Sequence, residues 1–105
     1  MIILGEFDEF GPGFGFPSIK EFISSEPFEH KDIVLEYMRA GHGCMASPSF
    51  IKDVITGERV IRPRVTMHDG VYLWSSSLIY HVERYNVRLP SEFIAHVLEK
   101  RTHSR

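Results

Sequence analysis

The spacing of apolar residues changes twice along this chain. Residues 18–40 and 76–98 place apolar side chains at helical intervals, whereas residues 43–74 between them alternate as strands do. Turn residues interrupt the alternating part at Thr56-Gly57 and Asp69-Gly70. This order predicts an α+β fold, with a small antiparallel sheet and about four helices, two before the sheet and two after it.

Local signals define the ends of the expected elements. The clearest hairpin runs from Arg64 to Trp74 around Asp69-Gly70. Ser18 and Glu21 have the spacing of a capping box, which predicts that the first helix starts there.

The other expected helices have equally clear stops and starts. The second covers about residues 31–40, and Gly41 is expected to end it in a left-handed conformation. Ser75-Ser76-Ser77 offers N-caps for a third helix that ends at Asn86, and a fourth follows Pro90.

Length and composition predict one domain over residues 1–105. The chain has 105 residues, of which 43% are hydrophobic and 25% charged, as in ordinary globular proteins. A chain of this size buries roughly two-thirds of its unfolded surface, enough for one core without a metal or a disulfide. No apolar run approaches the ~18 residues that span a bilayer, and Met1–Leu4 lacks the features of a signal peptide. We therefore expect a cytoplasmic protein that makes no membrane contact.

The charge is distributed unevenly. The net charge is −2, but residues 1–36 hold eight acids and two bases, a local charge of −6, which leaves +4 for the rest. Proteins that bind nucleic acids usually carry a net basic domain, because neutralising phosphates supplies most of their affinity. We expect no nucleic-acid partner.

Motifs that would carry chemistry are weak. The loop Gly11-Pro12-Gly13-Phe14-Gly15 lacks the residues that follow a phosphate-binding turn, and the six histidines do not have metal-ligand spacing. The single Cys44 excludes an internal disulfide, and its small and apolar neighbours favour a buried thiol. We expect no cofactor, no metal and no catalytic residues. The alternative is a small enzyme that uses Cys44 or a histidine group.

The N-terminal region alternates acids with aromatic rings. An aromatic side chain among carboxylates is a plausible anchor for a basic protein partner, and the competing interpretation is that the rings fill the core beneath a solvated acidic rim. We predict that this region contacts a partner through Glu6, Asp8, Glu9, Phe10, Phe14, Glu26 and Glu29.

Most of the chain resembles a group of small bacterial proteins. The likeness lies in residues 69–75, in Leu78, Tyr80, Val82, Glu83, Tyr85, Asn86, Leu89-Pro90 and Phe93, and in residues 53–58 and 17–19 with Phe22. Such proteins are often encoded beside polymorphic toxins of the Rhs and contact-dependent systems, and are taken to be immunity proteins.

The resemblance implies a binding function. The chain would bind a cognate toxin domain that is basic at its active site, and would neutralise it by occluding that site. A third alternative is a ligand-binding regulatory domain, which would have a deep apolar pocket with a few convergent polar groups.

Overall fold

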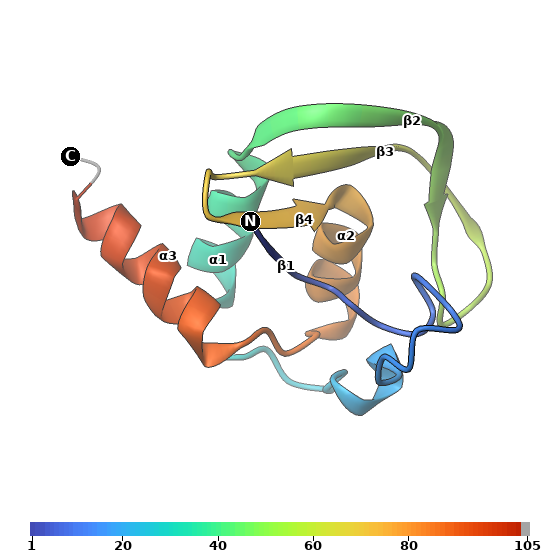
Figure 1. Ribbon diagram of the computed structural model, residues 1–105. Helices are drawn as coiled ribbons and strands as arrows, with labels where there is room; N and C mark the ends of the chain where they lie inside the picture. The colour runs from blue at the N-terminus through green and yellow to red at the C-terminus, as the bar shows by residue number, and fades with distance from the viewer. Residues whose placement is uncertain (104–105) are drawn as a thin grey trace.

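A computed structural model describes the backbone of residues 1–103 and the side chains of residues 1–101 (Figure 1). It confirms an α+β fold, with a four-stranded sheet and three α-helices in the described chain. In chain order the elements are β1 (Ile2–Ile3), the short 3₁₀ helix η1 (Ile19–Glu21), α1 (Lys31–Arg39), β2 (His42–Lys52), β3 (Arg59–His68), β4 (Tyr72–Ser75), α2 (Ser76–Tyr85) and α3 (Ser91–His103).

The sheet is mixed rather than purely antiparallel as predicted. Its strand order is β1-β4-β3-β2, and β2, β3 and β4 form the expected antiparallel hairpins. At the edge, Ile2 and Ile3 pair in parallel with Tyr72 and Leu73. Residues 1–4 are apolar and β-prone, which indicates a possible strand, but two paired residues are too few to show a period or to predict the parallel pairing.

The first expected helix is a single 3₁₀ turn. The predicted capping box is present, since the Ser18 amide donates to Glu21 and the Ser18 side chain caps the turn. The turn ends after three residues at Phe22. The capping box therefore located the start of the element, although it did not determine its length. The described chain has three α-helices rather than four.

The core lies between the sheet and the helices. In β4, Tyr72 and Trp74 are buried and face the helices, in alternation with the partly exposed Leu73 and Ser75. The Trp74 ring lies 5.9 Å from the ring of Phe93 in α3, and its indole N–H donates to the Met38 carbonyl in α1 at 3.1 Å. Burial of each large apolar side chain contributes about 1.5–3 kcal/mol.

The β2–β3 hairpin extends beyond the rest of the sheet and the helices, which we call the body of the protein. Only Thr66, Met67 and His68 of β3 pair with β4, so residues 46–52 and 59–65 form a two-stranded ribbon that has no other strand beside it. The ribbon crosses the top of the molecule and turns down beside α2 (Figure 1). Register shifts after Gly43, Ser47 and Phe50 accompany this course, and such irregularities bend and twist a strand pair.

Gly41 has a different role from the one predicted. It is absent from the residues with positive φ, so it is not a left-handed helix stop. Its missing side chain matters instead, because a Cβ atom there would lie 2.6 Å from the Trp74 ring. Gly41 permits the backbone to pass close to the buried indole.

We predict that Gly41→Ala destabilises the fold by about 1–3 kcal/mol, the usual cost of overpacking a core. Urea denaturation would measure this loss. Gly43→Ala is the matched control, since a Cβ there meets Val65 at an ordinary 3.5 Å. Equal midpoints for the two variants would contradict the role given to Gly41.

Candidate functional site

A buried carboxylate holds the free end of the ribbon against the body. Asp53 directly follows β2, is 2% exposed, and accepts hydrogen bonds from the amides of Ile55 (2.9 Å) and Thr56 (3.0 Å). Its other oxygen accepts the hydroxyls of Tyr80 (2.7 Å) and Tyr85 (2.5 Å) from α2. We call this group of five residues the Asp53 clamp.

The clamp determines the protonation of its members. Burial raises the pKa of Asp53, but the hydrogen bonds from Tyr85, the Thr56 amide and Tyr80 outweigh it and hold the pKa well below its usual range. Burial and the bond to Asp53 also raise the pKa of Tyr80 to about 12. The carboxylate is therefore charged at neutral pH, and its hydrogen bonds are made within the fold.

A histidine beside the Asp53 clamp makes a further hydrogen bond between the end of the ribbon and α2. The Val54 amide donates to Nε2 of the fully buried His81 at 3.1 Å, and Nδ1 lies 2.6 Å from the Ser77 carbonyl. Burial lowers the pKa of His81, which keeps the ring neutral and leaves Nε2 free to accept. His81 thus serves to hold the ribbon end.

Asp69 forms a similar group at the other hairpin turn. It accepts the amides of Val71 and Tyr72 at 2.9 and 2.7 Å, the Tyr37 hydroxyl at 2.5 Å, and is 2.7 Å from His96 Nε2. Burial raises the pKa of Asp69, but its hydrogen bonds, led by that of Tyr37, lower it overall. Both aspartates therefore act as structural anchors of turns.

Two of the predicted partner-binding residues are engaged in the fold. The Glu9 carboxylate accepts the Ser18 hydroxyl at 2.6 Å and the Ile19 amide at 2.8 Å, and so caps η1. Burial raises the pKa of Glu9, yet these hydrogen bonds lower it overall. The Phe10 ring is partly buried, 5.3 Å from the His81 ring.

The other predicted residues are exposed. Phe14 is 75% exposed and stacks on Phe16, with ring centroids 5.9 Å apart. The remaining acids of the predicted surface, Glu6, Asp8, Glu26 and Glu29, are also exposed. We call the exposed set Glu6, Asp8 and Phe14 the N-terminal surface.

The ribbon is a candidate surface that the sequence pattern did not reveal. It exposes large apolar side chains, with Phe50 at 46% and Ile61 at 84%. Its cations, Lys52, Arg59, Arg62 and Arg64, are exposed as well. Strand alternation normally signals one buried face, and only the length of the hairpin relative to the helices reveals that much of it lies in solvent.

The thiol is exposed, so the prediction of a buried Cys44 was wrong. Cys44 lies on edge strand β2, where most neighbouring side chains face solvent, and its Sγ is 3.5 Å from the Thr66 carbonyl. Nearby, the rings of His42 and His68 lie 5.8 Å apart. Within the part of the chain that the structure describes, no group of three or more His, Cys, Asp or Glu side chains could hold a metal ion.

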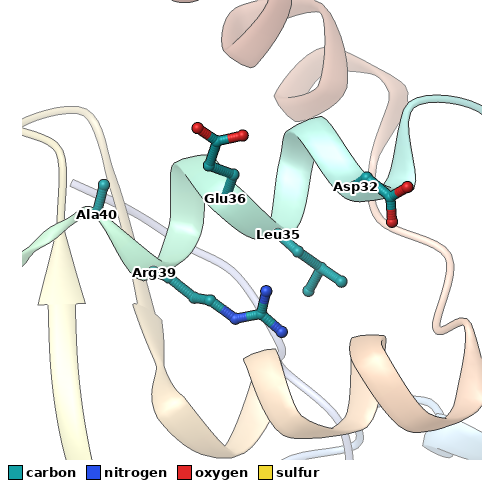
Figure 2. Close-up of a pocket in the computed structure, with 5 residues that line it drawn as sticks. All are labelled: Asp32, Leu35, Glu36, Arg39 and Ala40. Atoms are coloured by element: carbon teal, nitrogen blue, oxygen red, sulfur yellow. The ribbon is translucent and has the colours of Figure 1, made fainter.

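The surface of α1 contains a hollow whose polar side chains do not converge on a common point. It measures about 490 Å³ and is lined by Asp32, Leu35, Glu36, Arg39 and Ala40. Figure 2 shows Glu36 and Arg39 pointing to opposite sides of the helix. Arg39 instead pairs with Glu83 of α2. This hollow has neither the depth nor the convergent polar groups of a ligand pocket.

Comparison of the chain with protein-family models, with curated proteins and with solved structures finds no match. Over residues 1–103, no helix is long and apolar enough to cross a membrane.

We predict that Asp53→Asn costs about 3 kcal/mol of stability, because the variant loses the buried charge to which four donors are directed. Glu99→Gln, at an exposed position on α3, is the control and should change stability by less than about 0.5 kcal/mol. Since the folded pKa of Asp53 lies below the unfolded value near 4, its contribution is complete above about pH 4 and decreases as the pH falls further. Urea denaturation at pH 7 and at pH 3 would test this, and a variant as acid-sensitive as wild type would contradict it.

Proposed function

We propose that this chain binds one partner protein and is an immunity protein, which neutralises a cognate bacterial toxin domain by covering its active site. Two independent lines support the proposal: the resemblance noted in the sequence, and the presentation of an aromatic side chain at the N-terminal surface. The second line is the observation on which the proposal depends.

Phe14 is held away from the body by its neighbours. Gly13 and Gly15 on either side have φ angles of +95° and +76°, a conformation that residues with side chains rarely adopt. A Cβ atom at either glycine would meet nothing within 4 Å, so the tip of the loop is surrounded by solvent. Exposed aromatic rings are frequent energetic anchors of protein interfaces, because binding removes a large apolar area from water.

The acidic side chains of the N-terminal part of the chain indicate the kind of partner. Glu6 and Asp8 are exposed, and within the described residues neither forms an ion pair. Glu26 and Glu29 are exposed on the segment before α1, where Glu29 pairs only with His30. These carboxylates would match basic residues that the toxin uses for its own substrate. Opposite charge also accelerates encounter between partners.

The partner can be found by affinity purification. The tagged chain would be expressed in its own bacterium together with its genomic neighbours, and proteins that co-elute in stoichiometric amount would be identified by mass spectrometry. A toxin domain in a one-to-one complex would support the proposal. A chain that elutes alone, from cells shown to make the neighbouring toxin, would refute it.

We predict that Phe14→Ala weakens binding to the captured toxin domain by tenfold or more, roughly the ~2 kcal/mol loss of an interface hot spot. The stability of the free chain should not change, because the ring is 75% exposed. Val71→Ala, at a second exposed apolar side chain, is the control for binding. Isothermal titration calorimetry would measure both affinities, and equal values would exclude Phe14 as an anchor.

We predict that Glu6→Lys with Asp8→Lys slows association and reduces its dependence on salt, because the change removes the attraction to a basic partner. Glu9 is left intact because it caps η1. Glu99→Lys on α3 is the control for altered net charge. Stopped-flow association at two salt concentrations gives the comparison. Unchanged salt dependence in the double variant would mean that the partner binds elsewhere.

A further inference from the structure

The far end of the β2–β3 ribbon presents cations and apolar side chains on one face. Lys52 pairs with Arg59 across the strands, and Phe50 pairs with Pro63. Ile61 lies between Arg59 and Pro63 on β3, and its side chain is 84% exposed. We call Phe50, Lys52, Arg59, Ile61 and Pro63 the outer ribbon face. All five are exposed.

One residue pair at the end of the ribbon is shielded from solvent. Ile51 is 2% exposed and pairs with Val60, which is partly buried. The Asp53 clamp then fixes the ribbon end to α2. The outer ribbon face therefore belongs to a supported strand pair. A groove of about 530 Å³ lies among Ser49, Phe50, Ile51, Lys52, Gly57 and Arg59. Phe50 and Lys52 also line a hollow of about 200 Å³ with Glu9, Phe10 and Val54.

The pairing of Lys52 with Arg59 is unfavourable in the isolated chain. Like charges directly opposite each other destabilise a strand pair. Strands β2 and β3 contain no acidic residue, and among the described residues neither Lys52 nor Arg59 forms an ion pair with a carboxylate. The nearby Asp53 carboxylate is directed at the tyrosines of α2. An anion from another molecule would relieve this repulsion.

We propose that the outer ribbon face is a second docking surface, which binds an acidic segment of a partner protein. The pair of cations provides the charge complement. Phe50 and Ile61 beside them would bury apolar area, and this combination of arginine with apolar and aromatic side chains is typical of protein interfaces.

A nucleic acid fits these observations less well. Residues 1–36 carry a local charge of −6, which would repel a phosphate backbone. A partner protein can instead place its carboxylates against Lys52 and Arg59 while its apolar side chains contact Ile61. This surface differs in charge from the N-terminal surface and does not depend on the proposed immunity function.

Three labelled polymers test the proposal by fluorescence anisotropy: poly-L-glutamate, a random copolymer of glutamate and tyrosine, and a DNA duplex. The wild-type chain should bind both polypeptides, and it should bind the copolymer more tightly. Lys52→Glu should weaken polypeptide binding by about tenfold or more, since it both removes a cation and pairs Arg59 within the chain. Lys20→Glu, at an exposed position on η1, produces the same change in net charge and should have less than about a twofold effect.

Further measurements separate the surface from a folding defect and from other ligands. Lys52→Glu should raise the thermal midpoint, because an attractive pair replaces a repulsive one. Ile61→Ser should abolish the preference for the copolymer without weakening the binding of poly-L-glutamate. Failure to bind either polypeptide, or equal binding by the Lys52 and Lys20 variants, would overturn the proposal. Tighter binding of DNA than of the copolymer would also overturn it, in favour of a nucleic-acid surface.

Discussion

The shape of this protein depends on the burial of one carboxylate. Asp53 lies where the hairpin leaves β2, and its oxygens accept two backbone amides and two tyrosine hydroxyls. A buried charge is expensive unless its hydrogen bonds are satisfied, and these four donors satisfy it. The amides shape the turn and the tyrosines attach it to α2. Without that attachment the ribbon would lose its main polar contact with the body at that end, and the outer ribbon face would have no fixed position.

The sequence predicted those features that adjacent residues determine. The Asp69-Gly70 hairpin, the capping box at Ser18 and the helix that ends at Asn86 all depend on chemistry within a few positions. Features determined by distant residues were missed. From its neighbours in the sequence, Gly41 resembles a helix stop. The structure instead requires glycine there because a side chain would clash with Trp74, more than thirty positions away. β1 forms only because β4 offers it an edge.

The candidate sites follow the same division. The irregular loop around Phe14 was predictable because its flanking glycines prevent regular structure, whereas the sequence left open whether the ring was exposed or buried. Glu9 and Phe10 belong to the same acidic and aromatic stretch, but they contact Ser18 and His81, which lie later in the chain. The residues next to Glu9 and Phe10 do not indicate these contacts. The ribbon was missed for a related reason. Alternation of apolar and polar residues indicates that two segments are strands. Whether their side chains are buried depends on the elements that pack against the strands, and the helices pack against only part of this hairpin.

The register shifts in the ribbon also affect how the protein behaves at high concentration. β2 forms one border of the sheet, so its outer side presents unpaired backbone groups along an eleven-residue strand. A long, straight border of this kind invites pairing with another copy and, eventually, aggregation. The irregularities after Gly43, Ser47 and Phe50 interrupt the regular spacing of donors and acceptors, and Pro48 has no amide hydrogen to offer. The same irregularities that accompany the bend of the ribbon therefore also make its open border a poor template for self-association.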